Sequence, residues 1–163
     1  MYAIWLLFNK ADTKYLKEII KKISSEFNSP IFVPHITVYG LLNLEIKLIE
    51  KIVKRSIQNM EPFIIEKSKI KESNNIWKSL FVEIIMNQKL SLINKNLKLE
   101  LIKTTKYEFS PHISLLYEKI KKKNRILCVK NLKIKNKFQI DKIAILKFSN
   151  NVNEWEIIKT IKF

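Results

Sequence analysis

The sequence predicts a fold of mixed strands and helices that is built as an internal duplication. Apolar residues alternate between strand spacing and helical spacing along the 163 residues. A nearly identical phrase, aromatic-x-Pro-His-Ile-hydroxyl, occurs twice, 77 residues apart. At 47% hydrophobic residues the chain can bury a substantial core, which excludes wholesale disorder. We expect one domain over residues 1–163, made of two intertwined lobes.

The first half is predicted to contain two strands and two helices. An apolar strand over 2–8 precedes an amphipathic helix capped by Asp12 and ending near residue 27. A second strand over 36–39 is expected to stop at Gly40, and a second helix follows at about 44–57.

The second half is predicted to repeat this order and to close with a hairpin. Strands are expected over 62–71 and 77–85, a helix over 88–102, a strand over 113–117 and a lysine-rich helix to about 132. Two β-prone stretches, 136–148 and 154–163, are joined by an Asn-rich turn.

Composition excludes several kinds of functional site. A single Gly excludes the glycine-rich loops that bind nucleotide phosphates. A single cysteine, Cys128, excludes disulfide scaffolds and multi-cysteine metal sites. We therefore expect no metal and no cofactor.

The net charge of +16 suggests an anionic partner, but it is weak support for a nucleic-acid surface. Of 31 basic residues, 29 are Lys and only Arg55 and Arg125 are Arg. Specific phosphate and base contacts favour Arg. A chain rich in Lys, Ile and Asn is typical of A/T-rich coding, so the charge has an explanation without function. The run 121–123 is interpreted as a solvated helix face.

Both histidines of the chain lie in the duplicated phrase. Alternate residues of a strand share a face, so His35 lies beside Thr37, and His112 beside Ser114. If the copies pair about a twofold axis, the two pairs face one cleft. One neutral imidazole then removes a proton from water while the other, protonated, donates one to a leaving oxygen. The hydroxyls donate to phosphoryl oxygens.

Some of these residues also have a purely structural interpretation. A single strand histidine is more often structural than catalytic, but two copies using every His in the chain favour chemistry. Trp77 either stacks on a base at the cleft edge or belongs to the core. The sequence assigns Trp5 and Trp155 to the core, and Cys128 to a buried apolar position.

The paired motifs resemble the two-histidine phosphoesterase superfamily, and especially its cyclic phosphodiesterase branch. The resemblance covers essentially the whole chain through these segments: Ile4–Leu7, Phe32–His35, Trp77–Phe81, Pro111–Tyr117, Ile143–Leu146 and Glu154–Glu156. It implies an α+β, bilobed fold with pseudo-twofold duplication, in which two antiparallel sheets flanked by helices surround a central catalytic groove.

The resemblance also implies a function and site residues. His35 and His112 are the acid–base pair, and the resemblance favours His112 as the base and His35 as the acid. Thr37 and Ser114 bind the phosphate, and Tyr117 lines the cleft. The implied reaction is metal-independent hydrolysis of ADP-ribose 1″,2″-cyclic phosphate or nucleoside 2′,3′-cyclic phosphates to monophosphates.

Two alternatives stay open. One is RNA-end processing like that of the 2′-5′ RNA ligase branch, with RNA as partner; the other is a non-catalytic RNA or nucleotide binder. The residues favour a monomer that acts on a small molecule. The apolar N-terminus lacks the features of a targeting or membrane segment, and with a free cysteine this favours the cytoplasm.

Overall fold

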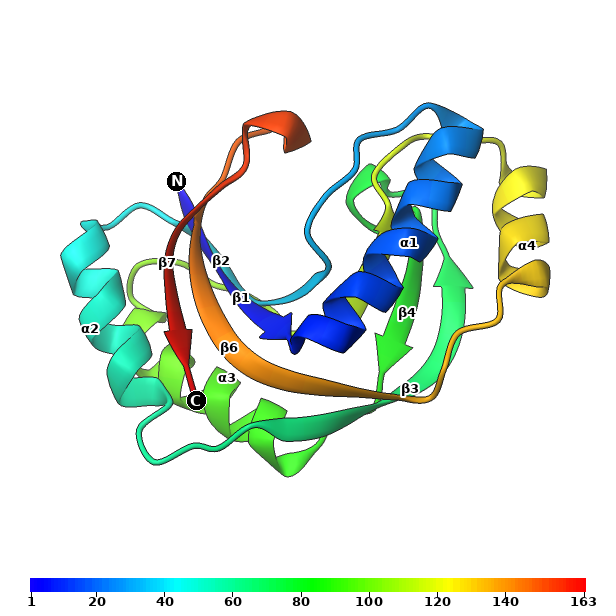
Figure 1. Ribbon diagram of the computed structural model, residues 1–163. Coiled ribbons are helices and arrows are strands. Elements are labelled where there is room, and N and C mark those ends of the chain that lie inside the picture. Colours follow the sequence, from blue (N-terminus) through cyan, green and yellow to red (C-terminus); the bar gives the residue numbers. More distant parts are fainter.

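The computed structural model describes all 163 residues, and its chain alternates strands and helices (Figure 1). The strands are β1 (Tyr2–Phe8), β2 (His35–Leu42), β3 (Phe63–Glu72), β4 (Leu80–Ile84), β5 (His112–Leu116), β6 (Lys137–Lys147) and β7 (Glu156–Lys162). The α-helices are α1 (Lys10–Phe27), α2 (Ile46–Ser56), α3 (Gln88–Leu101) and α4 (Lys122–Asn131), with short 3₁₀ turns η1 (Ile76–Lys78) and η2 (Val152–Glu154). No helix is long and apolar enough to cross a membrane.

All strand pairs are antiparallel, in the order β2-β1-β6-β3-β4-β5, with β7 also paired to β6. The long strand β6 joins two halves of this sheet, and its curved ribbon is visible in Figure 1. Its first residues, 137–140, pair with β3, whereas residues 140–147 pair with β1. The α+β prediction is confirmed, and its two sheets are the halves β7-β6-β1-β2 and β3-β4-β5, joined through β3 and β6.

The two halves exchange helices. The order β1-α1-β2-α2 in the first half is repeated as β4-α3-β5-α4 in the second. Helix α1 packs against β5, and its counterpart α3 packs against β2. Each histidine-bearing strand is therefore covered by a helix from the other half, which ties both strands to a common framework.

One hydrophobic cluster of 34 buried residues spans both halves. Helix α1 contributes Leu16, Ile20 and Ile23, which follow its 3.6-residue repeat. Helix α3 contributes Leu90, Ile93, Leu97 and Leu101 in the same way. Because these stripes meet the strands' inner faces, the helical positions are stabilised mainly by apolar burial.

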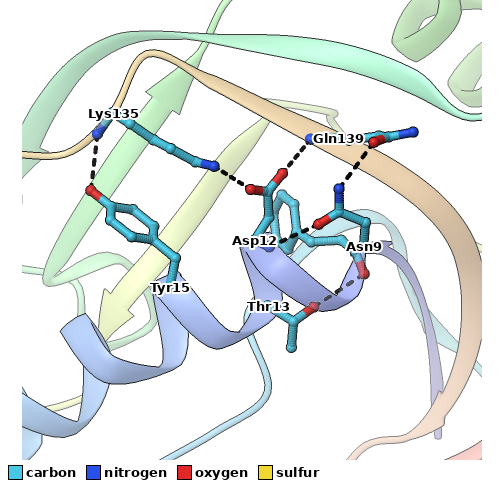
Figure 2. A network of polar contacts seen from close by, with 7 residues as sticks. Asn9, Asp12, Thr13, Tyr15, Lys135 and Gln139 are labelled. Carbon is cyan, nitrogen blue, oxygen red and sulfur yellow. Dashed lines mark hydrogen bonds and ion pairs between the residues drawn. The ribbon is translucent and has the colours of Figure 1, made fainter.

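The predicted cap of α1 is wrong by three residues. Asn9 is the N-cap, and its side-chain oxygen accepts a hydrogen bond from the Asp12 amide at 2.8 Å. Asp12 instead lies inside a polar network, where its carboxylate accepts from the Gln139 amide at 2.6 Å and pairs with the Lys135 ammonium (Figure 2). The network attaches the start of α1 to the start of β6 across 127 residues of sequence.

Two further boundaries differ from the sequence prediction. Strand β2 continues past Gly40 to Leu42, because a bulge against β1 absorbs the irregularity there. Trp77 lies in η1 rather than in a strand, and β4 begins only at Leu80. The Asn75 side chain caps this turn by accepting from the Trp77 amide at 3.0 Å. Trp77 is thus placed on a turn beside the sheet edge.

Candidate active site

The two histidines occupy equivalent positions, each as the first residue of its strand. The Nδ1 of His35 lies 2.7 Å from the Val33 carbonyl oxygen, and the Nδ1 of His112 lies 2.7 Å from that of Ser110. A carbonyl oxygen only accepts, so each Nδ1 carries the hydrogen. Each neutral imidazole therefore keeps its lone pair on Nε2, and the backbone selects the same tautomer at both sites.

Both histidines line one cavity of about 340 Å³. Thr37, Trp77 and Tyr117, which the sequence singled out, line the same cavity. The remaining lining residues are Ala3, Trp5, Gly40, Leu41, Tyr107, Phe148, Asn150 and Trp155. The duplicated motifs thus meet in one place although 77 residues of sequence separate their histidines.

Ser114 differs from its counterpart Thr37, because it does not line the cavity. Its side chain is buried, with 3% of its surface exposed, and its hydroxyl donates to the Trp77 carbonyl at 3.5 Å. This contact is at the long limit of a hydrogen bond. The Ser114 hydroxyl is therefore held loosely, behind the turn that carries Trp77.

Burial makes both imidazoles reluctant to take a proton. It lowers the pKa of His35 from 6.5 to about 3, opposed by the hydrogen bond to Val33, with a smaller lowering from His112. It lowers the pKa of His112 from 6.5 to about 4, opposed by the bond to Ser110, with a smaller lowering from Lys78. Both rings are neutral at pH 7 in the unliganded protein, and an anion between them would favour their charged forms.

Tyr117 lies against the first histidine. Its hydroxyl is 3.4 Å from Nε2 of His35, and its ring is buried. Burial raises the pKa of Tyr117 well above its ordinary value, with an opposing contribution from a hydrogen bond to Ser114. Tyr117 therefore remains a neutral hydroxyl that can donate to Nε2 or to a bound oxygen.

The sequence assigns Trp5 and Trp155 to the core alone. The structure corrects this, because both also line the cavity. The Trp5 indole stacks on the His35 imidazole, with centroids 3.4 Å apart, and Trp155 meets that imidazole edge-on at 5.9 Å. Trp77 and Trp155 lie nearly parallel with centroids 6.2 Å apart. The place of Trp5 in the cavity follows from the pairing of β1 with β2, which puts Trp5 opposite Thr37.

Tyr107 is a second residue that the sequence did not reveal. Its hydroxyl donates to the Thr37 carbonyl at 3.2 Å, and its ring lies 3.5 Å from the position that a β-carbon on Gly40 would occupy. The loop before β5 is thereby attached to β2, which closes one side of the cavity.

The arrangement is suited to proton transfer at an anionic centre. Two imidazoles with defined tautomers line one cavity together with Thr37 and Tyr117, and the Tyr117 hydroxyl lies 3.4 Å from Nε2 of His35. No three His, Cys, Asp or Glu side chains gather closely enough to hold a metal ion. The two imidazoles share their cavity with one further pair of titratable side chains, Tyr107 and Tyr117.

The family model described as "Cyclic phosphodiesterase-like protein" matches residues 1–163. The chain belongs to this family. The resemblance to two-histidine phosphoesterases is thereby confirmed. Among curated proteins, the cyclic phosphodiesterase of Arabidopsis thaliana is 21% identical over 120 residues, or 74% of this chain. The match spans 66% of that relative, just under two thirds of its length.

Two bacterial proteins are among the solved structures with a similar fold. TT0787 of Thermus thermophilus superposes with a TM-score of 0.66 at 12% identity, over 99% of this chain and 96% of that chain. LigT of E. coli, complexed with 3′-AMP, superposes with a TM-score of 0.63 at 11% identity, over the same shares. At these identities the likeness shows that the family fold is shared.

Proposed function

We propose that this protein is a metal-independent cyclic phosphodiesterase that opens ribose cyclic phosphates to monophosphates. The observation that carries the proposal is the pair of equivalent histidines, each with Nδ1 bonded to backbone and Nε2 available to one cavity. Membership of the cyclic phosphodiesterase-like family and the similarity to the Arabidopsis enzyme support it. The substrate class is ADP-ribose 1″,2″-cyclic phosphate or a nucleoside 2′,3′-cyclic phosphate.

In the proposed reaction His112 removes a proton from water as the water oxygen forms a bond to phosphorus. His35 first takes a proton from solvent at Nε2, which the bound anionic phosphate favours. The bond from phosphorus to one ribose oxygen then breaks, and His35 donates this Nε2 proton to that oxygen. The product is a ribose phosphate monoester with one free hydroxyl. Proton transfer from His112 back to His35, through solvent, restores the starting state.

Hydroxyl groups supply the proposed phosphate contacts. Thr37 donates to a non-bridging oxygen from the cavity wall, and Ser114 does so after leaving its long contact with Trp77. Tyr117 donates to the same phosphate from beside His35. Negative charge concentrates on these oxygens during the displacement, so the donors stabilise the transition state more than the substrate.

The proposed base subsite is the aromatic part of the cavity. Trp77, Phe148 and Trp155 line it, with centroid separations of 5.7–6.2 Å. A nucleobase stacking on Trp77 gains ~1–3 kcal/mol. The complexes of the E. coli neighbour with 3′-AMP, ATP and NADP+ support a nucleotide-sized ligand for this fold.

The test is turnover of 2′,3′-cyclic AMP and ADP-ribose 1″,2″-cyclic phosphate in EDTA, with product followed by phosphorus NMR. We expect monoester from the wild type, and a loss of at least ~100-fold in kcat for His35→Ala and for His112→Ala. Thr37→Val and Ser114→Ala should each lose ~10-fold or more. Lys47→Ala, an exposed change on α2, is the control. Full activity in both histidine variants contradicts the proposal.

RNA is the second candidate substrate. Lys119, Lys121 and Lys122 line a further cavity of about 540 Å³ just after β5, which bears the second motif. These lysines supply positive charge that a phosphate backbone could contact. If RNA is the substrate, its affinity falls steeply with salt, as expected for several phosphate contacts. Absence of binding at low salt excludes this candidate.

The proposal includes one domain over residues 1–163 that acts as a monomer in the cytoplasm. The hydrophobic cluster that spans both halves supports a single folding unit. Cys128 is the one cysteine and is free, as is usual in a reducing compartment. Light scattering on the purified protein tests the monomer.

A further inference from the structure

The surroundings of the two histidines differ in one charged residue. Lys78 lowers the pKa of His112 after the larger effect of burial, whereas the titratable neighbour that lowers the pKa of His35 is the other imidazole, His112. The duplicated motifs are otherwise alike in sequence and in the carbonyl bond to Nδ1. The asymmetry therefore comes from Lys78, which lies outside the motifs, and from Ser110, whose place in the first motif is taken by Val33.

Lys78 contacts two residues that surround His112. Its ammonium donates to the Ser110 hydroxyl at 3.1 Å, and the Ser110 carbonyl accepts the Nδ1 hydrogen of His112 at 2.7 Å. The same ammonium lies 4.8 Å from the centre of the Phe81 ring, which meets the His112 ring edge-on at 5.5 Å. Lys78 thus holds both the hydrogen-bond acceptor and the aromatic neighbour of this imidazole.

The backbone of Lys78 is itself fixed. It is the last residue of η1, its amide donates to the Asn75 carbonyl at 2.9 Å, and its carbonyl accepts from the Ser73 hydroxyl at 2.7 Å. Burial lowers the pKa of Lys78, with Glu83 raising it and Lys71 lowering it. A side chain that starts from a bonded turn and lies partly buried has little freedom to leave Ser110.

Trp5 in the first half and Phe81 in the second occupy equivalent positions, but only Phe81 has a lysine, Lys78, over its ring. Strand pairing puts Phe81 opposite Ser114, as it puts Trp5 opposite Thr37. Trp5 stacks face to face on His35, an arrangement that favours an imidazolium through the electrons of the ring. One histidine thus has a π-face beside it and the other has a cation nearby.

We propose that Lys78 is a positioning residue that holds Ser110 beside His112 and places its ammonium where it adds to the effect of burial on that imidazole. The consequence for catalysis, that Lys78 helps His112 to act as the proposed base, rests on the proposed function. Other titratable groups lie around His112 and Lys78. His35, Tyr107 and Tyr117 line the same cavity as His112, Glu83 on β4 pairs with His112 on β5, and Lys71 on β3 lowers the pKa of Lys78. Glu83 opposes Lys78, but its carboxylate is bonded to Lys71 at 2.6 Å.

The test is an NMR titration of both imidazoles in the wild type and in Lys78→Met. A cation near an imidazole disfavours its protonation, so its removal should raise the pKa of His112 by about 0.5–1 unit. His35 should shift less, and Lys78→Arg should restore the wild-type value. Lys47→Met, which removes the same charge from the exposed face of α2, is the matched control and should leave both histidines unchanged.

Ser110→Ala is a second variant, which removes only the hydroxyl oxygen that accepts from the Lys78 ammonium. We expect the pKa of His112 to rise in this variant too, because the ammonium is no longer held beside the ring. An unchanged His112 in Lys78→Met and Ser110→Ala, or an equal shift in Lys47→Met, overturns the proposal.

Turnover separates this proposal from the proposed function. In an active enzyme, the low-pH limb of kcat/KM should move to higher pH in Lys78→Met by the amount that NMR reports for His112. A limb that stays in place while His112 shifts overturns the assignment of His112 as base. Absence of turnover in the wild type overturns the proposed function, whereas the titration still decides the contact between Lys78 and His112.

Discussion

The indole of Trp5 lies parallel to the imidazole of His35, with ring centroids 3.4 Å apart and planes inclined by 8°. This stack fixes the ring plane of His35, and the Nδ1 bond to Val33 fixes its rotation within that plane. Together they aim Nε2 toward the cavity and toward the Tyr117 hydroxyl.

Replacing Trp5 with Leu should lower kcat by about 3- to 30-fold, which corresponds to the ~0.5–2 kcal/mol of an aromatic contact with a cation. The reason is that His35 loses its orientation and the π-face that favours its charged form. Steady-state kinetics on a 2′,3′-cyclic nucleotide measures the effect. Trp155→Leu changes the same wall without removing the stack, so it should act mainly on KM. A wild-type kcat in Trp5→Leu argues against a role for the stack.

Sulfate binding should strengthen as pH falls from 7 to 5. The free imidazoles, with pKa values near 3 and 4, are neutral over this range, and a bound dianion raises those values. Binding therefore takes up protons, which increases affinity up to about tenfold per pH unit for each proton. Isothermal titration calorimetry at pH 7, 6 and 5 measures this. His112→Asn should weaken the dependence of sulfate affinity on pH. A pH-independent affinity in the wild type would contradict the prediction.

The folded protein should lose stability as pH falls from 7 to 5. The unfolded chain protonates His35 near its ordinary pKa of 6.5, whereas the folded chain does so only near 3. More protons bind to the unfolded state over this range, so the free energy of unfolding decreases by up to ~1.4 kcal/mol per pH unit. Urea midpoints at pH 7, 6 and 5 give the slope. His35→Gln should reduce it, and an identical slope in that variant would exclude His35 as its source.

Asp12→Ala should destabilise the protein by about 1–3 kcal/mol, because the Gln139 amide loses its acceptor within a buried network. The Lys135 ammonium is partly exposed and can be hydrated again, so the loss of its ion pair contributes less to the destabilisation. Thermal and urea unfolding measure the loss. Glu18→Ala removes the exposed pair with Lys21 from the same helix and should cost less than about 0.5 kcal/mol. Equal losses in the two variants would show that the network contributes no more than a surface ion pair.

Most elements could be predicted because their signals are local. Helix α3 is expected over 88–102 and is found over Gln88–Leu101, since its apolar residues recur every three or four positions. Trp77 illustrates the limit: β propensity extends the predicted strand to this residue, whereas the cap from Asn75 forms a turn instead. Whether a side chain such as Asn75 or a neighbouring strand accepts from a backbone amide depends on local geometry, which residue propensities do not give.

The sequence was enough to predict the family and the order of strands and helices, and three of its four motif residues, His35, Thr37 and His112, line one cavity, whereas Ser114 does not. The sequence was enough because residues two apart share a strand face and because the Pro-His-Ile phrase is repeated. The exchange of α1 and α3 between the halves, the stacking of Trp5 on His35 and the bond from Lys78 to Ser110 near His112 are visible only in the folded chain. These relationships join segments far apart in the chain, and they form only when apolar burial packs the two halves around one core.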